Sequence, residues 1–190
     1  MPKRSEAVSL LEEWVQGEGL RKHMYAVEAA LRHYARLRGE DEERWGLAGL
    51  LHDLDWEKYP EEHPQRAVEE LRRLGYPEDV LHAILAHRSE FTKVEPESAL
   101  DRHLVACDEL AGLVFAASLV RPTGIDDLTP KSVIKKLKDR AFAAGVSRED
   151  VERGTALIGL ERAEHVQNVI DGLRSVAALL QIRGEDVSRA

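Results

Sequence analysis

Apolar residues recur at helical spacing along most of this chain, and no stretch alternates apolar and polar positions as a half-buried strand does. The first periodic stretch covers about residues 8–15 and stops at Gly17. A second runs from about 20 to 37, and Gly39 follows it, where glycine commonly ends a helix. The pattern therefore predicts an all-α fold.

Capping and breaking residues divide the rest of the chain into further helices. Asp41 and the acidic residues after it favour a helix start, because negative charge stabilises the amino end of a helix. That helix should end near His52. The later helices are predicted from the loop at 59–64 to Gly75, from Pro77 to about His87, from Ser98 to about Val120, from Thr129 with Pro130 first, from Ser147 with Asp150, and from about Leu160 to Ile182 with Gly184 as terminator.

The break at 121–130 separates a five-helix core, about residues 20–120, from a C-terminal helical extension, about residues 121–190. The whole chain has 190 residues, of which 43% are hydrophobic, and this is enough to bury a core. We expect a single domain over 1–190, with the extension as part of it.

Charge and composition narrow the function classes. The formal net charge of −8 argues against binding to polymeric nucleic acid, but it is compatible with a small anionic substrate held by a metal. The single cysteine, Cys107, allows no intrachain disulfide and favours a reduced compartment. The first six residues lack the apolar stretch of a signal peptide, and no apolar run approaches the ~20 residues that span a bilayer. We expect a cytoplasmic protein without a membrane partner, and a homodimer on general frequency.

The most informative residues are His52 and Asp53, which end the apolar stretch 45–51. Burying an imidazole beside a carboxylate costs free energy unless something compensates, and a metal ion is a common compensation. Further candidate ligands lie on both sides of this pair: His23 before it, and His63, His87 and Asp108 after it.

This order of histidines and aspartates resembles the HD-domain superfamily of metal-dependent phosphohydrolases, over about residues 20–119. The resemblance implies an HD-domain-like helical bundle with a buried metal site. The metal ligands that it implies are His23, His52, Asp53, His63, His87 and Asp108. Asp101 competes with Asp108 for the distal position, and His82 is the substitute for His87.

His63 and His87 decide how many ions the resemblance implies. If both bind metal, Asp53 bridges two ions, with His23, His52 and Asp108 on one ion and His63 and His87 on the other. If they do not, the site holds one ion, as in the nucleotidase branch of the superfamily. Imidazole and carboxylate ligands suit divalent Fe, Mn, Ni, Co or Zn, and Mg is also possible.

The candidate catalytic residues are Asp53, Asp55, Lys58 and Arg88. A bound divalent ion activates water for phosphoryl transfer, and cationic side chains such as Lys58 and Arg88 would neutralise the transferring group. Asp55, or its neighbour Glu57, would act as a general base or orient a ligand histidine. The basic cluster Lys131 to Lys138 is either an additional phosphate site or a solvated helix face.

The resemblance thus favours a metal-dependent phosphohydrolase that cleaves a nucleotide or another small phosphoester. Two alternatives remain open. A branch of the same superfamily holds two irons with a similar ligand set and activates dioxygen, so a di-iron oxygenase fits the same residues. A non-catalytic nucleotide-binding or sensor module would use the same fold without turnover.

Overall fold

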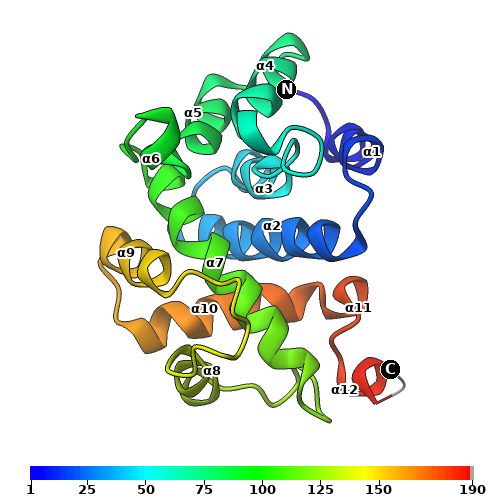
Figure 1. Cartoon of the computed structure of the whole chain (residues 1–190), viewed down its shortest axis with the longest axis vertical. Helices are drawn as coiled ribbons and strands as arrows, with labels where there is room; N and C mark the ends of the chain where they lie inside the picture. Colours follow the sequence, from blue (N-terminus) through cyan, green and yellow to red (C-terminus); the bar gives the residue numbers. More distant parts are fainter. Residues whose placement is uncertain (189–190) are drawn as a thin grey trace.

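A computed structural model describes residues 1–188 of the chain and shows an all-α architecture (Figure 1), which confirms the predicted fold class. Within these residues the only extended pairing is an isolated bridge between Gly124 and Arg183. The elements are α1 (Arg4–Trp14), α2 (Glu18–Arg38), α3 (Glu42–Leu51), η1 (Pro60–Glu62), α4 (Gln65–Arg73), α5 (Glu78–Ala86), α6 (Ser89–Thr92), α7 (Ala99–Leu119), α8 (Pro130–Leu137), α9 (Arg148–Ile158), α10 (Arg162–Ser175), α11 (Ala177–Leu180) and α12 (Gly184–Val187).

Capping side chains are present at four of the predicted helix starts. The side chains of Asp41, Ser98, Thr129 and Ser147 each accept a backbone N–H in the first turn of α3, α7, α8 and α9. At the other end of α2, Gly39 adopts a left-handed conformation with φ 70°, which glycine reaches at little cost. Local side-chain chemistry therefore fixes the ends of the helices that carry the site.

The prediction of one final helix from Leu160 to Ile182 was wrong. The helix α10 ends at Ser175, whose hydroxyl donates to the carbonyl of Gly172 and so competes with the helical hydrogen bonds. The chain turns at Val176 before α11, and Gly184 begins α12 instead of terminating a helix. The apolar periodicity hides this break, because residues on both sides of it are buried in the same core.

The helix α2 lies at the centre of the molecule. In Figure 1, α2 lies across the middle, α3 lies on one side of it and α10 on the other, and α7 crosses the bundle. Close approach requires glycine at two of these contacts. A Cβ on Gly49 would lie 2.8 Å from the backbone of Glu28, and one on Gly172 would lie 2.8 Å from Cα of Ala30.

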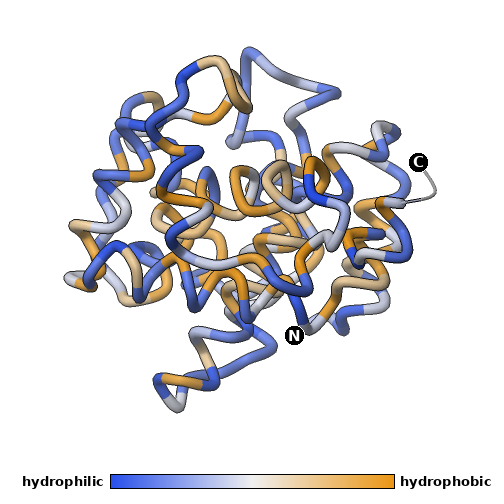
Figure 2. Tube along the Cα trace, turned by 90° about the horizontal axis from the view of Figure 1, so that it is seen from below, coloured by the Kyte–Doolittle hydropathy of each residue, from blue (hydrophilic) through white to orange (hydrophobic). Residues whose placement is uncertain are grey.

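The C-terminal extension packs against the core. The helix α9 lies along α7, α10 lies along α2, and α8 contacts α10 and α7. Buried residues of the extension, such as Val151 and Ile170, belong to the same apolar cluster as residues of α2 and α7. Figure 2 shows these hydrophobic positions gathered inside the bundle. Among the described residues, no helix has the length and hydropathy needed to cross a bilayer.

Candidate metal centre

The bundle brings the six candidate ligands together. His23 lies on α2, and Asp108 lies in the middle of α7. The other four follow the ends of helical segments: His52 and Asp53 after α3, His63 after η1, and His87 after α5. They form two groups, each with ligand atoms within 4.8 Å of one another: His23, His52 and Asp108 in the first, and Asp53, His63 and His87 in the second.

The first group is compact. Nε2 of His23 lies 3.2 Å from Nε2 of His52 and 3.0 Å from Oδ1 of Asp108. The same Asp108 oxygen lies 3.3 Å from Nε2 of His52. His52 is fully buried, whereas His23 and Asp108 remain partly exposed, so the group is open on one side.

Asp53 lies between the two groups and presents a different oxygen to each. Its Oδ2 is 3.4 Å from Nε2 of His52 and 3.8 Å from Nε2 of His23. Its Oδ1 is 3.4 Å from Nε2 of His63 and 3.7 Å from Nε2 of His87. A carboxylate placed in this way can bridge two cations.

Hydrogen bonds fix the tautomer of three of the rings. The Nδ1 atoms of His52 and His87 lie 2.9 Å and 2.5 Å from the carbonyl oxygens of Gly49 and Ile84. A carbonyl oxygen only accepts, so both Nδ1 atoms carry a proton, and Nε2 is the nitrogen of each ring that is available to a metal ion. Nδ1 of His63 donates in the same way to a carboxylate oxygen of Asp55 at 2.7 Å.

This donor set fits a metal ion. The Nε2 atoms of His63 and His87 are only 3.2 Å apart, so two lone pairs face each other unless a cation or a proton lies between them. In a metal-bound histidine, one ring nitrogen usually binds the metal and the other donates a hydrogen bond to a carbonyl or carboxylate. Imidazoles together with carboxylates suit divalent transition metals.

The electrostatics of the protein alone also favour positive charge here. Burial opposes a charge on His52, but the adjacent carboxylates of Asp53 and Asp108 more than offset this and raise the pKa of His52 well above its usual range. Burial would raise the pKa of both carboxyls, yet the histidines hold them well below the usual range. His87 behaves differently, because burial lowers its pKa and keeps the ring neutral.

Comparison with known families agrees with this geometry. The family model named HD domain matches residues 20–113, from the start of α2 into α7. All six candidate ligands lie within the match. Residues 20–113 of the chain belong to the HD-domain family. HD domains are generally metal-dependent phosphohydrolases. No curated protein and no solved structure matches the chain.

Asp55 of the HD domain has no free oxygen. One oxygen accepts from His63, and the other accepts the backbone N–H of Ala67 at 2.8 Å. Its side chain is fully buried. Of the two roles predicted for Asp55, the contacts match the orientation of a ligand histidine. Its neighbour Glu57 accepts the backbone N–H groups of Gln16 and Gly17 and so holds the α1–α2 connection.

The two cations predicted for catalysis lie in different surroundings. The ammonium of Lys58 lies 4.6 Å from the ring centre of Trp14, and no polar contact joins it to the six ligand groups. The guanidinium of Arg88 lies 4.6 Å from the ring centre of Phe91, and its Nε donates to Glu90. Arg88 directly follows His87 and lines a pocket beside the centre, so its position suits contact with substrate.

The alternative ligands Asp101 and His82 lie in neither group. Nδ1 of His82 is 3.0 Å from Oδ2 of Asp101, and the same oxygen accepts the backbone N–H of Ser98 at the start of α7. Asp101 therefore takes part in capping the helix that carries Asp108, and His82 contacts the capping carboxylate. The basic cluster Lys131 to Lys138 lies on and just after α8, which contacts α10 and α7, and none of its residues lines the pocket beside the centre.

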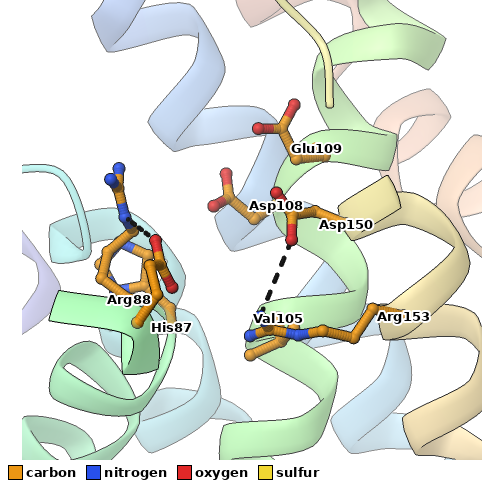
Figure 3. A pocket seen from close by; sticks show the side chains of 8 residues that line it. His87, Arg88, Val105, Asp108, Glu109, Asp150 and Arg153 are labelled. Carbon is orange, nitrogen blue, oxygen red and sulfur yellow. Dashed lines mark hydrogen bonds and ion pairs between the residues drawn. The ribbon is translucent and has the colours of Figure 1, made fainter. Parts of the chain in front are cut away.

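A pocket of about 230 Å³ opens beside the HD-domain centre (Figure 3). Its lining includes Glu109, which the sequence analysis did not single out although it directly follows Asp108. Burial and the charge of Asp108 raise the pKa of Glu109 to about 7. One of its oxygens accepts the backbone N–H of Ser147 at 3.0 Å, so it also joins α7 to the start of α9.

Proposed function

We propose that this chain is a metal-dependent phosphohydrolase with a binuclear centre, which cleaves a nucleotide or another small phosphoester with water. One observation carries the proposal: the two oxygens of Asp53 face two separate pairs of histidine Nε2 atoms. The family match and the Nδ1 hydrogen bonds of His52 and His87, which direct Nε2 of each ring at the centre, support it.

The chain's own residues would divide the work as follows. His23, His52 and Asp108 would hold one divalent ion, His63 and His87 would hold the other, and Asp53 would be available to both. Ions held there would supply activation of water and neutralisation of phosphoryl charge. Arg88, at the pocket wall beside His87, adds a guanidinium that pairs with phosphoryl oxygen. Asp55 keeps the proton on Nδ1 of His63 and so keeps its Nε2 lone pair on the centre.

The first experiment is elemental metal analysis of the purified protein beside an Asp53→Ala variant. We expect close to two transition-metal ions per chain and loss of at least one ion in the variant, because its methyl side chain offers no oxygen to either group. Asp79→Ala is the matched control, since Asp79 is an exposed aspartate that pairs with Arg44 on the surface.

Turnover is then measured on a panel of phosphoesters without oxygen, with the reconstituted metals. Anaerobic release of phosphate supports hydrolysis, whereas turnover that occurs only in a parallel aerobic assay, with consumption of dioxygen, would assign the oxygenase alternative. One ion per chain with activity would leave a mononuclear, nucleotidase-like enzyme. Absence of metal after reconstitution would contradict the proposal and leave a binding module.

A further inference from the structure

The pocket beside the metal centre is built from two parts of the chain. Residues at the end of α5 form one side, α9 of the C-terminal extension forms the other, and residues of α7 lie between them, as Figure 3 shows. The lining residues are His87, Arg88, Glu90, Val105, Asp108, Glu109, Asp150 and Arg153. His87 and Asp108 are candidate metal ligands, so anything in the pocket contacts the centre directly.

The α9 wall lies outside the matched HD domain, which ends at residue 113. It is nevertheless held firmly against α7. A Cβ on Gly154 would lie 2.5 Å from Cα of Ala106, so the two backbones are in direct contact. Ser147, the cap of α9, donates its backbone N–H to Glu109. Asp150 and Arg153 therefore have a fixed position relative to Asp108.

The lining of this pocket is almost entirely charged. Val105 is its one apolar residue, and the others include two guanidiniums and several carboxylates. A nucleobase or aryl group is usually held by apolar and aromatic walls, which this lining does not offer. Hydroxyl groups, in contrast, donate to carboxylates and accept from guanidiniums. The volume of about 230 Å³ also lies below the ~300–1,000 Å³ usual for ligand pockets, which favours a small molecule.

Arg153 has donors to spare for such a ligand. Its one ion pair is a long contact of 3.8 Å with Asp150, and both side chains are partly exposed on the pocket side of α9. Arg88, on the opposite wall, already donates its Nε to Glu90. The pocket thus has a phosphate-proximal end at the metal ligands and a polar end at α9.

We propose that Asp150 and Arg153 form a specificity subsite that binds the hydroxyl-bearing part of a small polyol phosphate, with its phosphoryl group at the metal centre. The inference rests on the proposed hydrolase function for the reaction, but the subsite itself is a binding claim. It commits the enzyme to a sugar or polyol phosphate in preference to an aryl phosphate or a nucleotide.

The test compares Arg153→Ala and Asp150→Asn with wild type on two probes, ribose 5-phosphate and 4-nitrophenyl phosphate. We expect KM for ribose 5-phosphate to rise by about 10-fold in Arg153→Ala, with kcat and metal content unchanged, because a charge-assisted hydrogen bond is lost. KM for the aryl phosphate should stay the same. Arg162→Ala is the matched control, since Arg162 is similarly exposed and pairs with Glu152 outside the pocket.

Equal KM values in Arg153→Ala and Arg162→Ala would overturn the subsite, and so would an equal loss for both probes. If wild type hydrolyses no phosphoester, the hydrolase proposal fails and the subsite is tested by calorimetric titration of ribose 5-phosphate into the metal-loaded protein. Binding weakened by Arg153→Ala but not by Arg162→Ala supports the subsite. Absence of binding, or binding that neither variant changes, overturns it.

Discussion

At the scale of single residues, the centre depends on what lies behind each ligand. The sequence singled out six candidate ligand positions, which the fold brings together, but it left Asp55 with two possible roles. The contacts favour the orienting role, because both Asp55 oxygens already accept hydrogen bonds, from His63 and from the backbone of Ala67. Which groups a side chain can still reach is a property of the packed structure, and no spacing in the sequence contains it.

Asp55→Asn should therefore weaken metal binding without removing a ligand. An amide can accept from only one of the two donors that Asp55 now serves, and it loses the negative charge beside His63. We expect metal affinity of the group around His63 and His87 to fall by about 10–100-fold. Competition with a chelator measures this, with Asp79→Asn as the control. Unchanged affinity would show that Asp55 does not orient His63.

The buried side chain of His165 makes the free energy of unfolding depend on pH. His165 is fully buried, donates from Nε2 to the carbonyl of Ala106 and accepts at Nδ1 from the hydroxyl of Tyr34. Burial lowers its pKa to about 4. An unfolded histidine titrates near 6.5, so between these values only the unfolded chain takes up the proton. The contribution of His165 to stability is therefore full above pH 6.5 and is lost as the pH falls toward 4.

His165→Gln should make the free energy of unfolding less steep in this range, by up to about 1.4 kcal/mol per pH unit. Urea unfolding at pH 6.5, 5.5 and 4.5 in the presence of chelator measures the slope. His33→Gln, at a partly exposed position, is the control. Parallel slopes for wild type and His165→Gln would contradict the assignment.

At the scale of helices, the sequence was most informative where a capping side chain marks the end of a helix. Thr129 and Ser147 cap the helices that they were predicted to cap, and Asp41 and Ser98, where helices were predicted to begin, cap α3 and α7. The break at Val176 was missed because it has no such marker and because apolar residues continue through it. A turn that folds back onto the same core keeps the hydrophobic pattern intact, so periodicity alone cannot reveal it.

Gly154 is the element-level contact with the clearest expected effect. In Gly154→Val, atoms of the new side chain would meet the backbone of Ala106 and Val105 on α7, which cannot rotate away. We expect a loss of about 1–3 kcal/mol in the free energy of unfolding, as α9 moves outward. Thermal unfolding checks this against Gly19→Ala, whose Cβ would meet nothing within 4 Å. A Tm equal to that of the control would refute the tight contact.

At the scale of the whole molecule, the six candidate ligands could be singled out from the sequence because their order in the chain resembles that of the HD domain. The pocket could not be predicted from the sequence, because it depends on how α9 lies against α7. Residues 105–109 and 150–153 are distant in the sequence, and no periodicity reports which helix faces which. The C-terminal extension, which we predicted as part of a single domain with the core, supplies one wall of the pocket.

The ligands of the first group, His23, His52 and Asp108, come from helices that meet only in the assembled bundle. Metal should thus bind after the folding barrier has been crossed. We expect added metal to leave the refolding rate unchanged and to slow unfolding, by about 100-fold when free metal is 100 times its Kd. Stopped-flow experiments with and without metal measure the refolding rate and the unfolding rate. Faster refolding with metal would instead mean that the ion nucleates the fold. The order of metal binding and folding therefore tells whether the cell must supply metal during synthesis or can supply it afterwards.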